Sequence, residues 1–68
     1  MNLSLLGLNA LVGGASAGIG RATAQELAAL GANVTLLART ESALQAALET
    51  LDTTQGQQHA YLVADFAD

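Results

Sequence analysis

Glycine residues cluster between an apolar run and a helical pattern near the start of the chain. Four of the eight residues from 13 to 20 are glycine, in the order Gly-Gly-Ala-Ser-Ala-Gly-Ile-Gly. Glycine allows a backbone to turn sharply and to approach a ligand without Cβ clashes. A helix that begins after such a turn presents unpaired N–H groups and the positive end of its dipole to an anion. The stretch therefore predicts a phosphate-binding turn. A purely structural turn is less favoured, because four glycines cost backbone entropy.

Two charged residues follow other apolar runs of the chain. Arg39 comes directly after residues 33–38, and Asp65 comes after residues 59–64. A guanidinium binds a phosphate through a forked, charge-assisted pair of hydrogen bonds, and a carboxylate accepts hydrogen bonds from an amine. The structural alternatives are a solvated surface arginine and a helix cap at Asp65, for which Asp68 is also available.

Three predicted strands and two predicted helices position these groups. Residues 9–13, 33–38 and 59–64 are short apolar runs bounded by turn residues, which is typical of buried parallel strands. We expect a helix over residues 21–30 that ends at Gly31, and a second helix that Thr40 caps. The predicted inner face of the first helix is Ile19, Ala22, Thr23, Leu27 and Leu30, and that of the second is Leu44, Ala47, Leu48 and Leu51.

The resulting pattern is β-α-β-α-β, an α/β arrangement. Right-handed crossovers between parallel strands predict the strand order 3-2-1, with both helices on one face of the sheet. The other face would then expose a contiguous apolar patch, which more chain or a partner would have to cover. Ligands bind beyond the carboxyl ends of such strands, so the glycine turn, Arg39 and Asp65 should share one crevice.

Size and charge exclude several classes of function. The 68 residues make at most one small domain, and half of them are apolar, which argues against disorder. With two basic residues and a net charge of −4, neither nucleic-acid binding nor a basic membrane-binding face is expected. The chain has no cysteine and one histidine, so no metal site is expected. The start resembles neither a signal peptide nor a membrane span, and the expected location is the cytoplasm.

The glycine segment in this context resembles that of the short-chain dehydrogenase/reductase family. The resemblance covers nearly the whole chain and rests on residues 10–22, on Leu-Leu-Ala-Arg at 36–39 and on Ala-Asp at 64–65. It implies a Rossmann-like, doubly wound parallel sheet, of which residues 1–68 would be the N-terminal part of one NADP(H)-binding domain. The residues implied to hold the cofactor are Gly14, Ser16, Gly18, Ile19 and Gly20 at the pyrophosphate and adenosine ribose, Arg39 with Thr40 at the 2′-phosphate, and Asp65 at the adenine.

The end of the second strand bears on the choice of cofactor. A site for NAD(H) places Asp or Glu there to accept from the ribose 2′-hydroxyl. This chain has Ala38 followed by Arg39, and Ser16 can donate a further hydrogen bond, so NADP(H) is expected over NAD(H). Gly13 stands where the family usually has threonine, which predicts a looser turn and weaker cofactor binding.

The family's catalytic serine, tyrosine and lysine have no equivalents in these residues. Tyr61 is followed four residues later by Asp65 and the chain contains no lysine, so we interpret Tyr61 as a strand residue. His59 has no partner in the sequence and is expected at the surface or at a strand edge.

By resemblance, the parent protein would be an oxidoreductase that transfers hydride between nicotinamide and a carbonyl or alcohol, with a 3-oxoacyl-thioester-reductase-like activity. It would be a homo-oligomer, a tetramer or dimer, acting on a small molecule. The alternatives are a non-catalytic nucleotide-binding fragment or module, and a site for an adenosyl donor or a flavin nucleotide.

Overall fold

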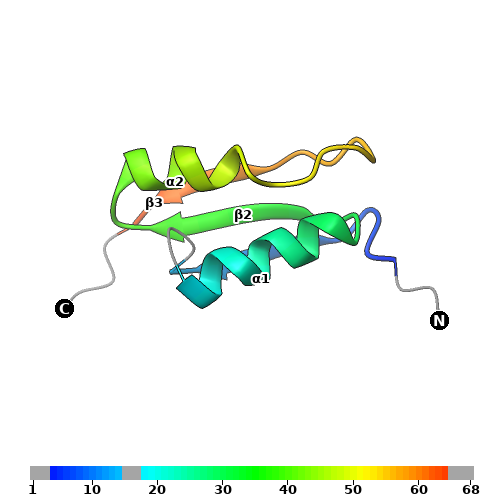
Figure 1. The fold of residues 1–68 in the computed structure, drawn as a ribbon, viewed down its shortest axis with the longest axis horizontal. Coiled ribbons are helices and arrows are strands. Elements are labelled where there is room, and N and C mark those ends of the chain that lie inside the picture. The colour runs from blue at the N-terminus through cyan, green and yellow to red at the C-terminus, as the bar shows by residue number, and fades with distance from the viewer. Residues whose placement is uncertain (1–3, 15–17, 65–68) are drawn as a thin grey trace.

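The computed structural model describes residues 4–14 and 18–64, which form a parallel sheet with two helices. The elements are β1 (Asn9–Gly13), α1 (Gly18–Ala29), β2 (Asn33–Ala38), α2 (Glu41–Leu48) and β3 (Ala60–Val63). β2 lies between β1 and β3 and is parallel to both. This order confirms the predicted 3-2-1 arrangement. Both helices cover the same face of the sheet (Figure 1), as right-handed crossovers require.

The core lies between β2 and the two helices. Val34 and Leu36 of β2 are almost completely enclosed, as is Leu44 of α2. The predicted inner face of α2 is confirmed, because Leu44, Ala47 and Leu51 are buried and Leu48 packs against the core. Leucines at these spacings form one apolar stripe, so the sequence pattern and the packing agree.

The predicted inner face of α1 is only partly right, because Leu27 packs against the core but Ile19, Ala22 and Thr23 do not lie inside. Ala24 and Ala28 are fully buried, whereas the side chain of Ile19 is 87% exposed and Ala22 and Thr23 are exposed too. Small side chains allow the helix axis to lie close to the sheet, and this close approach decides which face turns inward. Of the larger apolar residues on the predicted face, Leu27 packs against the core, whereas Ile19 lies on the outside of α1. The helix also begins at Gly18, three residues before the predicted start at residue 21.

Glycine ends α1 as predicted. Gly31 has a φ of 106°, its N–H donates to the carbonyl of Ala28 at 2.9 Å, and the N–H of Ala32 donates to that of Leu27 at 3.1 Å. This pair of hydrogen bonds is the Schellman motif, which needs a left-handed residue at the position of Gly31. The chain can then turn directly into β2.

The face of the sheet that the helices do not cover is apolar, as expected. Leu11 of β1 and Leu62 of β3 are 67% and 58% exposed. On β2, the half-exposed Thr35 and Leu37 alternate with buried residues, and the strand register places Thr35 opposite Leu11 and Leu37 opposite Leu62. These four side chains form one uncovered surface, of the kind that usually marks an interface.

His59 joins β2 to the segment that precedes β3. Its Nδ1 accepts a hydrogen bond from the backbone N–H of Val34 at 3.0 Å, and its Nε2 lies 2.7 Å from the carbonyl oxygen of Asp52. Both contacts are satisfied by the neutral ring with its proton on Nε2. The imidazole thus extends the strand ladder one residue before β3 begins, which confirms the expectation of a strand-edge histidine.

Replacing His59 with phenylalanine is expected to destabilise the fold by about 1–3 kcal/mol, because the part-buried N–H of Val34 would lose its acceptor. The free energy of unfolding from urea titrations would measure this loss. The control is Gln58→Ala, which removes an exposed neighbouring side chain. The backbone N–H of Gln58, which donates to Oδ1 of Asn33, is kept in this variant. Equal stability of the two variants would contradict the role given to the ring.

Candidate functional site

The carboxyl ends of the three strands lie at one edge of the sheet. Gly13 pairs with Leu37, and Ala38 pairs with Val63. The N–H of Ala64 also donates to the carbonyl of Ala38 at 2.8 Å, so β2 and β3 stay joined to their ends. The first turns of α1 and α2 lie at this same end of the molecule (Figure 1). Both helices therefore direct their N–H groups and the positive ends of their dipoles toward this edge.

The backbone on either side of the predicted phosphate turn is open. Gly14 and Gly18 have φ values of 65° and 62°, a region that side chains rarely adopt. Among the described residues, apart from the chain neighbours and the backbone of α1 itself, no atom lies within 4 Å of the position that a Cβ would take at either glycine. A phosphate can therefore come close to this backbone, and a side chain at these positions would occupy that space. Ser16, which is also predicted to contact the cofactor, lies outside the described residues.

The first turn of α1 carries the other two residues predicted to line the turn. Ile19 is largely exposed, and Gly20 is half-buried.

The end of β2 presents Arg39 to solvent beside this turn. Ala38 is only 7% exposed, whereas Arg39 and Thr40 are exposed. Thr40 takes the expected N-cap position of α2 with an extended backbone, but its side chain forms no capping hydrogen bond. The prediction that Thr40 caps α2 is thus right in position and wrong in the hydrogen bond.

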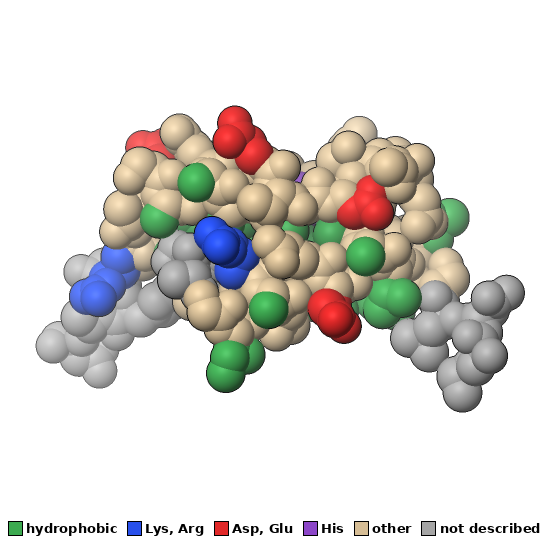
Figure 2. Space-filling view, viewed as in Figure 1, with side chains coloured by type: hydrophobic (Ala, Val, Ile, Leu, Met, Phe, Trp, Pro, Cys, Tyr) green, Lys and Arg blue, Asp and Glu red, His purple; other side chains and the backbone are tan. Residues whose placement is uncertain are grey.

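Asp65, the residue predicted to bind adenine, lies outside the described residues, which end at Ala64 on this part of the chain. The structure therefore brings together Gly14, Gly18, Arg39 and Thr40. Figure 2 shows both basic side chains of the chain over the half of the molecule that contains this edge, while acidic side chains are spread over its length. Positive charge and helix N-termini at one end favour an anionic ligand there.

A hydrogen-bonded cluster beside this edge was not predicted from the sequence. The hydroxyl of Tyr61 on β3 donates to Oε2 of Glu41 at 2.9 Å, and Nε2 of Gln45 donates to the same hydroxyl at 3.0 Å. Tyr61 is confirmed as a strand residue. The signal available in the sequence was the spacing of four between Glu41 and Gln45, which puts both on one face of a helix.

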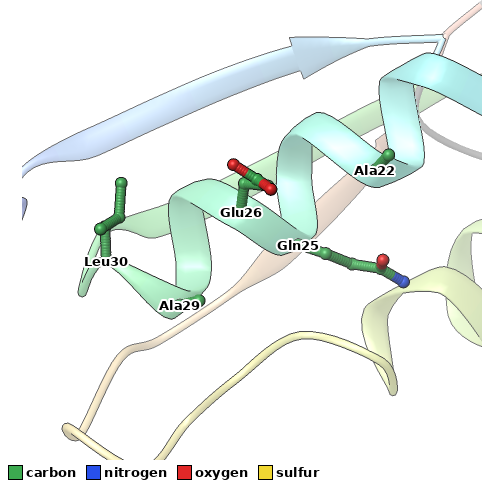
Figure 3. A pocket seen from close by; sticks show the side chains of 5 residues that line it. All are labelled: Ala22, Gln25, Glu26, Ala29 and Leu30. Carbon is green, nitrogen blue, oxygen red and sulfur yellow. The ribbon is translucent and has the colours of Figure 1, made fainter.

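The surface depression in Figure 3 lies on α1, away from the glycine turn. It is lined by Ala22, Gln25, Glu26, Ala29 and Leu30. Gln25 points toward the segment after α2, where its Nε2 donates to Oγ1 of Thr50 at 2.9 Å. The lining holds a single carboxylate and no basic group, so it does not extend the anion-binding edge.

Within residues 4–14 and 18–64, no cluster of three or more histidine, cysteine, aspartate or glutamate residues is placed to hold a metal ion. No helix in the same ranges is long and apolar enough to cross a membrane.

A parallel β-α-β-α-β unit with a glycine turn after its first strand is the Rossmann-type arrangement of nucleotide-binding proteins. The sequence model of the short chain dehydrogenase family matches residues 8–68. The chain therefore belongs to the short-chain dehydrogenase/reductase family, which confirms the resemblance stated from the glycine segment.

Individual relatives agree with this assignment. The chain is 43% identical over 58 residues to the inactive hydroxysteroid dehydrogenase-like protein 1 of Pongo abelii, and the match covers 85% of this chain and 18% of that protein. The solved structure of L-sorbose reductase from Gluconobacter frateurii, complexed with NADPH and L-sorbose, is 32% identical with a TM-score of 0.85. That match covers 96% of this chain and 25% of the reductase.

A short chain dehydrogenase from Shigella flexneri, complexed with NADP, is 34% identical with a TM-score of 0.86, over 100% of this chain and 28% of that one. The chain thus spans about a fifth of the curated relative and about a quarter of the two solved structures.

Proposed function

We propose that this chain is the N-terminal, NADP(H)-binding part of a Rossmann domain in an oxidoreductase. The observation that carries the proposal is the exposed Arg39 next to a buried Ala38, at the strand edge that also holds the open backbone positions Gly14 and Gly18. An NAD(H) site would place a carboxylate at the end of β2, whereas a guanidinium there can bind a 2′-phosphate. The NADP complexes of two similar structures support this choice of cofactor.

In this proposal Gly14, Gly18, Ile19 and Gly20 hold the pyrophosphate and the adenosine ribose, largely through backbone N–H groups. Arg39 and Thr40, together with Ser16, bind the 2′-phosphate, and Asp65 accepts from the adenine amino group. Ser16 and Asp65 lie outside the described residues, and the positions of the other six around the carboxyl ends of the strands support the proposal. The phosphate-binding part needs no side chain, so Gly13 in place of threonine weakens the support of the turn without removing the site.

Separate titrations with NADPH, NADH and S-adenosylmethionine test this assignment in the full-length protein. We expect NADPH to bind most tightly and S-adenosylmethionine to show no saturable binding. Tight binding of S-adenosylmethionine alone, or of a flavin nucleotide alone, would overturn the oxidoreductase proposal.

The proposed reaction is hydride transfer between the nicotinamide and a small carbonyl or alcohol substrate, of which a 3-oxoacyl thioester is one candidate. Its catalytic residues would lie outside these 68 residues, which contain no lysine. Membership of the dehydrogenase family supports this reaction class. We also propose that the full-length protein is a homo-oligomer, a tetramer or dimer, located in the cytoplasm. The apolar face of the sheet that the helices leave uncovered is a surface that further protein would bury.

A second candidate function is a nucleotide-binding module without catalysis. One observation favours it specifically: the relative from Pongo abelii, 43% identical to this chain, is named inactive. The intact mass of the purified protein and NADPH oxidation with a panel of carbonyl compounds separate the two candidates. A mass near 6.8 kDa with no turnover supports the module, and a several-fold larger mass with turnover supports the enzyme.

A further inference from the structure

We propose that Tyr61 and Gln45 are positioning residues that hold the Glu41 carboxylate against β3, so that it does not compete with a phosphate for Arg39. The inference rests on the proposed NADP(H) site and adds a determinant of cofactor preference within it. The observation that supports this inference is the chain of hydrogen bonds from Gln45 through the Tyr61 hydroxyl to Glu41.

The carboxylate lies close in sequence to the proposed phosphate ligand. Glu41 is the first residue of α2 and follows Arg39 by two positions, with the N-cap residue Thr40 between them. It is also the only acidic residue in the first turn of α2. A negative charge at this place interacts favourably with the helix dipole, but it repels a phosphate that is bound at the start of the same helix. The carboxylate could also neutralise the guanidinium directly, which would weaken its attraction for a phosphate.

The hydroxyl of Tyr61 determines where this carboxylate is held. Tyr61 comes from β3, where it pairs with Leu36, and its ring is half-buried against the core. The rigid, packed ring therefore fixes the position of its oxygen relative to α2. The 2.9 Å hydrogen bond to Oε2 then ties the exposed Glu41 side chain to the sheet.

Gln45 determines the direction in which that hydroxyl donates. A phenol has one hydrogen to donate, and its oxygen can also accept. Nε2 of Gln45 occupies the accepting side at 3.0 Å, so the phenolic hydrogen is directed to the Glu41 carboxylate. Glu41 and Gln45 are one helical turn apart, so both reach the same hydroxyl without distortion of α2.

The test compares NADPH and NADH dissociation constants for variants of the full-length protein. Tyr61→Phe keeps the ring and removes the hydroxyl. We expect it to weaken NADPH binding by about three- to tenfold, from repulsion between a released carboxylate and a phosphate several ångströms away in water, and to change NADH binding less than twofold. The loss should shrink as salt is added, because exposed charges are screened. Adding Glu41→Gln to Tyr61→Phe should restore the NADPH affinity.

A second variant and a matched control guard against an indirect effect of folding. Gln45→Met, at an exposed position, removes the hydrogen bond that Gln45 donates to the Tyr61 hydroxyl. It should weaken NADPH binding in the same way as Tyr61→Phe, but by a smaller factor. Gln25→Met breaks an equivalent glutamine hydrogen bond on α1, to Thr50, and should leave the ratio of the two dissociation constants unchanged.

The outcomes separate this inference from the proposal beneath it. The positioning role would be overturned if Tyr61→Phe lost the same affinity for both cofactors, or if adding Glu41→Gln did not restore its NADPH affinity. The NADP(H) site would still stand in that case if Arg39→Ala weakened the binding of NADPH alone. If the unaltered protein binds both cofactors equally and Arg39→Ala changes neither, both proposals fail.

Discussion

Replacing Arg39 with aspartate is expected to reverse the cofactor preference. The variant loses a charge-assisted pair with the 2′-phosphate, worth about 1.5–3 kcal/mol, which corresponds to a roughly ten- to hundredfold loss of NADPH affinity. The new carboxylate repels the phosphate and can accept from a free ribose 2′-hydroxyl, so NADH binding should improve. Together these effects should change the ratio of dissociation constants by about a hundredfold or more.

The chain offers a charge-matched control for this experiment. Arg21, its only other basic residue, is exposed on α1. Arg21→Asp changes the net charge by the same amount and should weaken both cofactors by a similar factor, because the altered field acts on the pyrophosphate that they share. A variant at Arg39 that binds NADPH as tightly as the unaltered protein would refute the proposed phosphate contact.

Gly18→Ala is expected to weaken NADPH and NADH binding together, by at least about tenfold. The φ of 62° costs an L-residue about 1–2 kcal/mol, and the added methyl group would fill the open space through which a phosphate reaches the backbone. The effect should not discriminate between the cofactors, because the pyrophosphate is common to both. Isothermal titration calorimetry with each cofactor would measure it.

Gly56→Ala separates backbone strain from a blocked site. Gly56 has a φ of 82° and equally open surroundings, but it lies in the loop between α2 and β3. We expect this variant to lose similar stability and to keep its cofactor affinity. If Gly18→Ala and Gly56→Ala bind both cofactors alike, the backbone at Gly18 does not touch the phosphates.

Much of the fold could be predicted because its local signals are strong. The bounds of β1 and β2 agree with the predicted residues 9–13 and 33–38, since short apolar runs between turn residues leave few alternatives. The face of α2 was predicted from leucines at helical spacing. The face of α1 was predicted only at Leu27, because its fully buried residues are alanines and periodicity gives most weight to large apolar side chains.

The candidate site divides in the same way. The glycine turn and Arg39 could be proposed as binding groups from the sequence, because their chemistry depends on residue type and on order along the chain. The role of the Tyr61 hydroxyl could not, because Tyr61 and Glu41 are twenty positions apart and meet only when β3 pairs with β2.

The sequence by itself determined the order of the elements, the family and the residues at the ends of the strands, because all three follow from local patterns of neighbouring residues. Only the tertiary structure decided which face of α1 turns inward, that His59 completes the ladder of β2, and where the Glu41 carboxylate is held. These features depend on how closely elements from distant parts of the chain approach one another. Packing sets that distance, and local residue patterns do not contain it.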